Sequence, residues 1–125
     1  MPQVDLIIET YVHAPAEVVA PDVDAAEFAP RLWRDWSVRA SQRRGTEGVR
    51  WELSDARLAG TCEVWIQRLR DDSCLLHTFA RVDPRGRPWP AWRAELASRR
   101  FRARLTRRLW RFKDDVEKRA VDFDR

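Results

Sequence analysis

The chain has 125 residues, of which 44% are hydrophobic and 35% are charged. These proportions exclude a disordered chain, and the length fits a single domain over residues 1–125 that needs no disulfide or metal for stability. No apolar run reaches the roughly 18 residues of a membrane span, and acidic residues occur within the first ten. We therefore expect no transmembrane helix, no secretory signal and a cytoplasmic location.

The beginning of the chain predicts one strand and two short helical segments. Apolar and polar residues alternate over residues 3–13, which is typical of a strand with one buried face. Residues 14–20 favour a short helix that Pro21 ends, and residues 22–30 favour a second helical turn before Pro30.

The middle of the chain predicts a meander of antiparallel strands. Four β-like runs occupy residues 36–43, 48–54, 58–68 and 74–83, and the links between them are short and polar. The proline-rich segment 84–90 ends the sheet, because proline cannot donate to a ladder of backbone hydrogen bonds.

One long amphipathic helix is predicted from about Ala91 to Ala120. Its apolar positions recur every three or four residues: Ala94, Ala97, Phe101, Leu105, Leu109, Phe112, Val116 and Ala120. The opposite side carries arginines: Arg99, Arg100, Arg102, Arg104, Arg107, Arg108 and Arg111. The apolar stripe must therefore lie on another apolar surface.

The net charge of +4 is unevenly distributed. Residues 1–84 carry a net charge of −4 and residues 85–125 carry +8, with nine basic residues and one acidic residue between positions 93 and 113. Such a cluster could bind nucleic acid or an acidic membrane surface, or it could be the solvated face of the helix. No nucleic-acid motif accompanies the charge, so nucleic acid is disfavoured as a partner.

The turns between the strands determine which side chains share a face of the sheet. A turn centred on Asp71 pairs Trp65 with His77, and a turn centred near Ala56 pairs Trp51 with Thr61. Together these registers predict one face that combines large apolar groups with three ionisable ones: Val49, Trp51, Leu53, Thr61, Glu63, Trp65, Leu75, His77, Phe79 and Arg81. We expect the long helix to cover this face. A slip of one residue in either turn would exchange the two faces.

Glu63, His77 and Arg81 would then form a polar cluster within an apolar cleft, where they could orient a ligand or move a proton. The alternatives are a structural Glu–Arg pair, or a different register that leaves all three groups in water. The cysteines, Cys62 and Cys74, lie twelve residues apart and indicate neither a zinc site nor a disulfide. We expect no metal and no cofactor.

Aromatic residues mark the entrance to the sheet. Trp33 and Trp36 flank Arg34 and Asp35, where the mouth of a cavity would lie. Trp89 stands between two prolines and is expected to fill the gap between sheet and helix.

Several segments resemble a known superfamily. The opening ETYVHAPAEVV is similar to the strand-then-helix entry of the SRPBCC superfamily, which has the START, polyketide-cyclase and birch-pollen-allergen helix-grip fold. The stretch GVRWELSDARLAGTCEVWIQRLRDDSCLLHTFARVDP and the helix ending WRFKDDVEKR resemble small actinobacterial members of the polyketide cyclase/dehydrase-like type. The resemblance implies an α+β fold in which a curved antiparallel sheet of five to seven strands wraps around a long C-terminal helix. It also implies short helices after the first strand and a hydrophobic cavity between sheet and helix. It carries over no catalytic residue, because the superfamily has no common one.

Three functions follow as hypotheses. The first is the binding of a small hydrophobic or amphipathic molecule (a lipid, polyketide or isoprenoid) by a monomer or homodimer. Its candidate binding residues are Trp36, Val49, Trp51, Glu63, Trp65, His77, Phe79, Arg81, Phe101 and Leu105. The second is a cyclase or dehydratase in which His77 is the acid or base, Glu63 tunes it and Arg81 stabilises an enolate. The third is a nucleic-acid or ribosome-associated protein that uses the arginine face of the helix.

Overall fold

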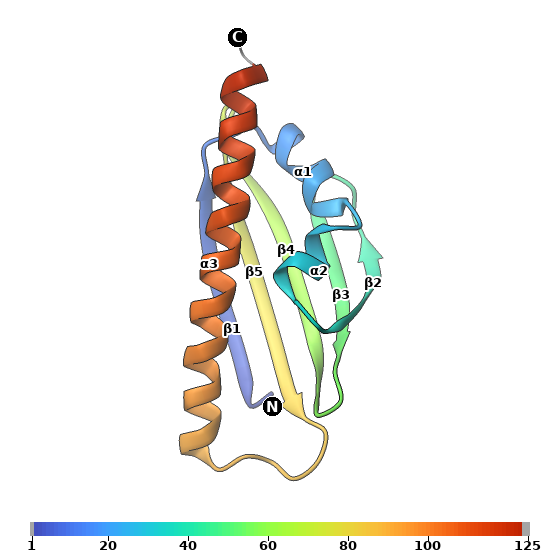
Figure 1. Cartoon of the computed structure of the whole chain (residues 1–125). Coiled ribbons are helices and arrows are strands. Elements are labelled where there is room, and N and C mark those ends of the chain that lie inside the picture. Colours follow the sequence, from blue (N-terminus) through green and yellow to red (C-terminus); the bar gives the residue numbers. More distant parts are fainter. Residues whose placement is uncertain (1, 124–125) are drawn as a thin grey trace.

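The computed structural model describes the backbone of residues 2–123 and the side chains of residues 2–121 (Figure 1). Within this part of the chain the elements follow the predicted order. They are β1 (Val4–Val12), α1 (Ala16–Asp24), α2 (Phe28–Leu32), β2 (Ser37–Arg43), β3 (Gly48–Ser54), β4 (Leu58–Arg70), β5 (Ser73–Pro84) and α3 (Ala91–Phe123). The predicted α+β architecture, with short helices after the first strand and a long helix at the end, is confirmed.

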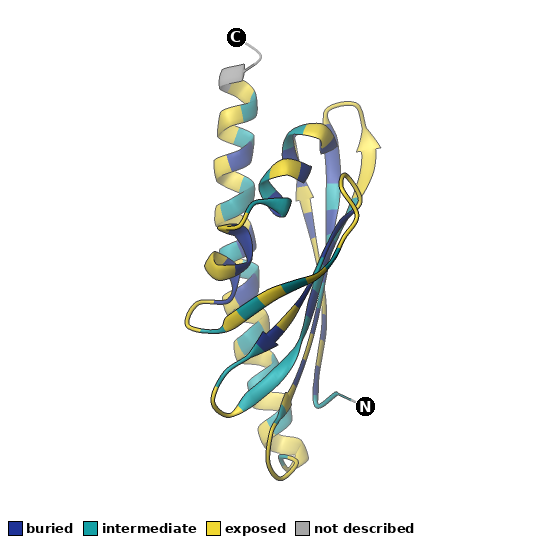
Figure 2. Cartoon of the chain, turned by 90° about the vertical axis from the view of Figure 1, so that its right-hand side faces the viewer, coloured by how far each residue is buried: buried dark blue, intermediate teal, exposed yellow. Residues whose placement is uncertain are grey.

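The strands form one antiparallel sheet in the order β1-β5-β4-β3-β2. All three helices lie on the same face of it: α3 runs along β1, while α1 packs over β3 and β4 (Figure 1). Seen from the side, the sheet is strongly twisted, and its other face carries no helix in the described part of the chain (Figure 2). We call the helix-covered side the inner face and the opposite side the outer face.

Both prolines that were predicted to end helices lie inside them. Pro21 is in the middle of α1, which continues to Asp24, and Pro30 lies in α2. Pro30 falls in the first turn of its helix, where a missing N–H removes no intrahelical hydrogen bond. At Pro21 one such bond is lost, but the burial of Val19 and Val23 against the sheet holds the helix together.

The long helix was predicted correctly. α3 has 33 residues and a length of about 50 Å. Leu105, Leu109 and Val116 of the predicted stripe are fully buried against the sheet, and Phe101 and Phe112 are half-buried beside them. Within the described residues, none of the helices is both long enough and apolar enough to cross a membrane.

The register between β4 and β5 agrees with the prediction, but the register between β3 and β4 differs by one residue. Trp65 pairs with His77 as expected, whereas Trp51 pairs with Cys62 and not with Thr61. The cause is the β3–β4 turn. Asp55 Oδ1 accepts hydrogen bonds from the N–H groups of the second and third residues after it (2.7 and 2.9 Å), and the Asp55 N–H donates to the carbonyl of the third (2.9 Å). The loop is thereby two residues long instead of three.

This one-residue difference changes which side chains of β4 lie on the same face of the sheet as the apolar side chains of β3. Its apolar side chains share the inner face with the even-numbered residues of β4 and β5: Val49, Trp51, Leu53, Cys62, Val64, Leu76, Thr78, Ala80 and Val82. The odd-numbered residues of β4 and β5 lie on the outer face. The predicted single face of aromatic and ionisable groups was therefore wrong.

The two cysteines are free and buried, and they are not neighbours. Cys62 lies opposite Ala80, and Cys74 lies opposite Val12. Burial raises the pKa of the Cys62 thiol to about 12 and that of Cys74 to about 11, so both remain protonated near neutral pH.

Candidate functional site

The three ionisable residues predicted to form one cluster lie on the outer face, away from α3. Each has its own ion-pair partner on a neighbouring strand. The pairs are Glu63 with Arg50 (3.9 Å, Oε1 to Nη1), His77 with Glu9 (3.6 Å, Nδ1 to Oε1) and Arg81 with Asp5 (3.6 Å, Nε to Oδ1). His77 Nε2 also lies 2.8 Å from Gln67 Oε1. The three residues therefore do not form one polar cluster in a cleft. They lie in separate pairs on the outer face of the sheet.

The other predicted binding residues fall in three places. Trp65 and Phe79 are half-buried on the outer face, next to the ionisable residues. Val49 and Trp51 are buried in the core beneath the helices. Trp36, Phe101 and Leu105 border a pocket beside α3. The predicted set therefore cannot line one cavity between sheet and helix.

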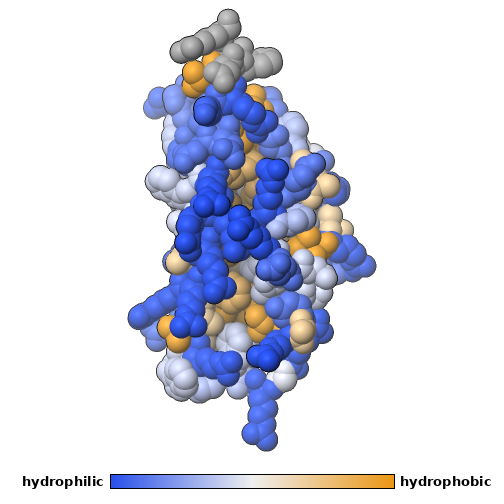
Figure 3. Space-filling view, viewed as in Figure 1, coloured by the Kyte–Doolittle hydropathy of each residue, from blue (hydrophilic) through white to orange (hydrophobic). Residues whose placement is uncertain are grey.

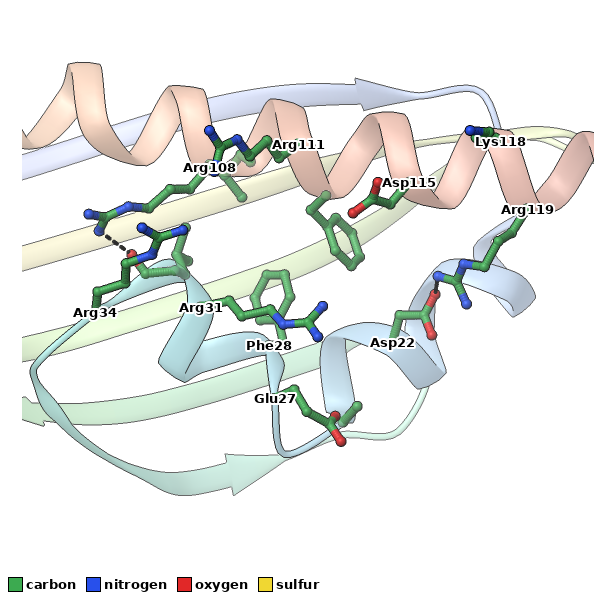
Figure 4. Close-up of a pocket in the computed structure, with 14 residues that line it drawn as sticks. Asp22, Glu27, Phe28, Arg31, Arg34, Arg108, Arg111, Asp115, Lys118 and Arg119 are labelled. Carbon is green, nitrogen blue, oxygen red and sulfur yellow. Dashed lines mark hydrogen bonds and ion pairs between the residues drawn. The ribbon is translucent and has the colours of Figure 1, made fainter.

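A groove lies between α3 and the short helices. This groove has a volume of about 690 Å³ (Figure 4). It is lined by Asp22, Ala25, Glu27, Phe28, Arg31, Leu32, Arg34, Arg108, Leu109, Arg111, Phe112, Asp115, Lys118 and Arg119. Phe28 of α2 and Phe112 of α3 meet edge to face across it, with ring centroids 4.9 Å apart. The groove thus has an apolar floor between polar walls.

A smaller hollow, the arginine pocket, adjoins one end of the groove and has a volume of about 370 Å³. It is lined by Trp33, Arg34, Asp35, Trp36, Phe101, Arg104, Leu105 and Arg108. Arg34 and Arg108 line both hollows, so the two are adjacent. The sequence predicted a cavity mouth at residues 33–36, and a pocket lies there.

Aromatic rings form one wall of the arginine pocket. The centroids of Trp33 and Trp36 lie 5.2 Å apart, and Phe101 lies 6.0 and 6.1 Å from them. Asp35, between the two tryptophans, has a φ of 66°, a left-handed conformation that aspartate tolerates better than most residues. The tight turn through Asp35 holds both indole rings against α3.

The walls carry more positive than negative charge. Six basic side chains and three carboxylates line the groove, and three arginines and one carboxylate line the arginine pocket. In the view of Figure 3, hydrophilic side chains crowd over the middle of α3 and its border with α2, with apolar surface visible between them. Asp22 is already paired with Arg119, which neutralises the groove at the end farthest from the arginine pocket.

Arg108 is fixed in place where the two hollows meet. Its Nη1 donates a hydrogen bond of 2.9 Å to the carbonyl oxygen of Leu32, the last residue of α2. Partial burial lowers the pKa of Arg108, and the positive charges of Arg34, Arg104 and Arg107 lower it further. Arginine stays protonated in proteins, so Arg108 is a cation surrounded by these like charges and by the opposite charge of Asp35.

Sequence reasoning missed Phe28, Arg31, Arg108 and Arg111 as residues of the hollows. Arg108 and Arg111 were assigned to the solvated side of α3, but they lie on the flank of the helix that faces α2. No group of three or more possible metal ligands occurs among the described residues.

Solved structures with the same arrangement show which fold this is. A START superfamily protein from Mycobacterium smegmatis matches 95% of this chain and 98% of its own with a TM-score of 0.68 and 14% sequence identity. The chain has the START-like helix-grip fold. The protein DR_A0006 from Deinococcus radiodurans (90% of this chain, 97% of that one, TM-score 0.62, 11% identity) and the Aha1 dimer from Colwellia psychrerythraea (91% and 96%, 0.61, 9%) are also similar.

No protein-family model matches the chain, and no curated protein matches its sequence. A likeness of 9–14% identity establishes the helix-grip fold and leaves the function open, because function depends on the site residues and not on the fold. The groove and the arginine pocket of this chain therefore have to be interpreted from their own chemistry.

Proposed function

We propose that this helix-grip protein binds a small amphipathic molecule, such as a lipid, polyketide or isoprenoid, in the groove between α3 and the short helices. The observation that carries the proposal is the groove itself, an open hollow of about 690 Å³ with Phe28, Leu109 and Phe112 in its lining. Binding sites for small molecules are concave and combine apolar surface with polar groups, and this groove is concave, with apolar side chains among its charged ones.

The location differs from the one expected from the sequence. Trp51, which was expected to line a cavity between the sheet and α3, is buried, and its ring lies 5.6 Å from that of Phe28 in α2. Apolar side chains border the groove instead at the junction of the helices, where the half-buried Phe112 and the buried Phe28 line it (Figure 4). A ligand would lie along α3 without entering the core.

The cyclase alternative has less support from the geometry. Its proposed acid or base, His77, lies on the outer face with Glu9 and Gln67, and Glu63 and Arg81 have separate partners there. None of these groups lines the groove. Binding without chemistry is therefore the function that the arrangement of residues favours.

A blocking substitution tests the proposal. Ala25 lines the groove, whereas its neighbour Ala26 is exposed and does not. We expect the wild-type protein to bind the neutral probe Nile red with a saturable rise in fluorescence. Ala25→Trp, which fills the groove with an indole ring, should weaken this binding at least about tenfold, the equivalent of losing one well-packed apolar contact.

Ala26→Trp is the matched control and should bind like the wild type. Native mass spectrometry of freshly purified protein should also detect bound apolar molecules in the wild type and fewer in Ala25→Trp. Equal affinity of all three proteins for Nile red, or no saturable binding at all, would contradict the proposal.

A further inference from the structure

The arginine pocket holds three arginines and one carboxylate, so positive charge is in excess there. Arg34, Arg104 and Arg108 form no ion pair with any residue whose side chain the structure describes. Asp35 is the one acidic residue in the lining of this pocket. Three cations held together at this density repel one another, and an anion between them would relieve that repulsion.

We propose that the arginine pocket binds the anionic end, a carboxylate or a phosphate, of the amphipathic ligand whose apolar part lies in the groove. This inference rests on the proposed function and adds the chemical class of the ligand. Arginine is suited to the task, because its planar guanidinium group can donate two parallel hydrogen bonds to a carboxylate or phosphate.

The cations come from two segments that are far apart in the sequence. Arg34 follows α2, and Arg104 and Arg108 lie one turn apart on α3. The hydrogen bond from Arg108 to the Leu32 carbonyl connects these segments and fixes the spacing between them. The site is therefore held in shape before a ligand arrives, which reduces the entropic cost of binding.

The surroundings favour an amphipathic ligand over a free anion. Aromatic side chains stand beside the arginines, since Trp36 and Phe101 also line the pocket and can contact an apolar part of the ligand. Arg34 and Arg108 line both hollows, so an anionic group in the pocket would lie next to the groove that contains Phe28 and Phe112.

The experiment compares ligands that share one chain and differ in the head group. Dodecanoate, dodecyl phosphate and the neutral dodecanol are titrated below their critical micelle concentrations by displacement of Nile red, and inorganic phosphate serves as the head group without a chain. We expect both anionic amphiphiles to bind the wild type at least about tenfold more tightly than dodecanol, the effect of one charge-assisted hydrogen bond. Inorganic phosphate alone should not displace the probe.

The double variant Arg34→Gln/Arg104→Gln should reduce the preference for the anions over dodecanol about tenfold. Both arginines are exposed, and neither donates a hydrogen bond to a described residue, so the fold should persist. Arg100→Gln, an exposed position of α3 that lines neither hollow, is the matched control and should keep the wild-type preference.

The outcomes separate the two proposals. If dodecanol and the anions bind equally to the wild type, or if Arg100→Gln lowers the preference as much as the double variant, the anion site is refuted while the groove stands. If no amphiphile binds, the proposed function fails and this inference fails with it. If inorganic phosphate binds as tightly as dodecyl phosphate, the site is one for a free anion and the amphipathic class is wrong.

Discussion

Replacing Trp51 by alanine tests the observed register of β3 against β4. In the structure Trp51 lies on the inner face with 4% of its surface exposed, and its ring packs 5.6 Å from that of Phe28. Trp65 lies on the outer face, half-buried, with the guanidinium of Arg44 5.4 Å from its ring centroid. In the register shifted by one residue, both tryptophans would share one face and one degree of burial.

The two substitutions should therefore have different costs. Removing a buried tryptophan from a packed core costs about 3–5 kcal/mol, which includes the transfer of the indole ring and the cavity left behind. Trp65→Ala removes a partly solvated ring and one exposed cation–π contact, for which we expect a loss of about 1 kcal/mol. The expected difference is then about 2–4 kcal/mol, a large fraction of the stability of an ordinary domain.

Urea denaturation followed by far-ultraviolet circular dichroism measures both losses, because the 33-residue helix α3 dominates the signal. The dependence of the free energy of unfolding on urea should be the same in both variants. Equal losses of stability, or a greater loss for Trp65→Ala, would refute the register and with it the assignment of the inner face.

Three other substitutions test separate parts of the structure by the same method. Thr78→Val should leave the stability unchanged or raise it by about 1 kcal/mol, because the buried Thr78 hydroxyl has no hydrogen-bond partner among the described residues; a clear loss would show a hidden partner. Gly60→Ala should cost at least about 2 kcal/mol, since a Cβ there would stand 1.9 Å from a backbone oxygen of β5, while Gly86→Ala meets open space and should be neutral. Burial opposes the ionisation of Glu117, but hydrogen bonds from Lys113 and from a backbone N–H outweigh this effect and lower the pKa of Glu117. Glu117→Gln should therefore reduce the free energy of unfolding by about 1–2 kcal/mol at neutral pH. This difference should disappear as the pH falls through the lowered pKa, since the stabilisation exists only while Glu117 is ionised, and a difference that persists in acid would contradict it.

The elements were predictable because each depends on a local pattern. Alternation over β1 places Val4, Leu6 and Ile8 on the inner face, and spacings of three and four residues place Leu105 and Leu109 of α3 against the sheet. Such patterns need only the geometry of a single strand or helix. Both elements were found within two or three residues of their predicted bounds.

The β3–β4 register was not predictable on the same basis. The link Asp-Ala-Arg is compatible with a loop of two or of three residues, and these alternatives place opposite faces of β3 against β4. The outcome depends on whether the Asp55 carboxylate accepts hydrogen bonds within the turn, as it does here. In the observed register the inner-facing Trp51 pairs with Cys62, so Glu63 lies on the outer face together with His77 and Arg81 of β5.

The groove depends on packing between segments about 80 residues apart. Phe28 and Phe112 meet only because α2 docks beside α3, and the hydrogen bond from Arg108 to Leu32 forms only in that arrangement. No local pattern in either segment specifies the distance between the two helices. The tryptophans at positions 33 and 36 were a usable signal, because two large aromatic residues around a polar dipeptide mark a turn that must pack on something.

The arginines of α3, which carry much of the positive charge of the chain, make different contacts along the helix. Arg99 pairs with Glu95 of the same helix, and Arg102 donates to the carbonyl of Ile7 on the edge strand β1. Arg108 and Arg111 line the groove instead, where they meet arginines of α2 and the turn after it. The positive charge that remains without a partner is therefore concentrated beside an apolar surface. The proposed anion site lies at this concentration of positive charge, where a bound anion would reduce the repulsion among the arginines.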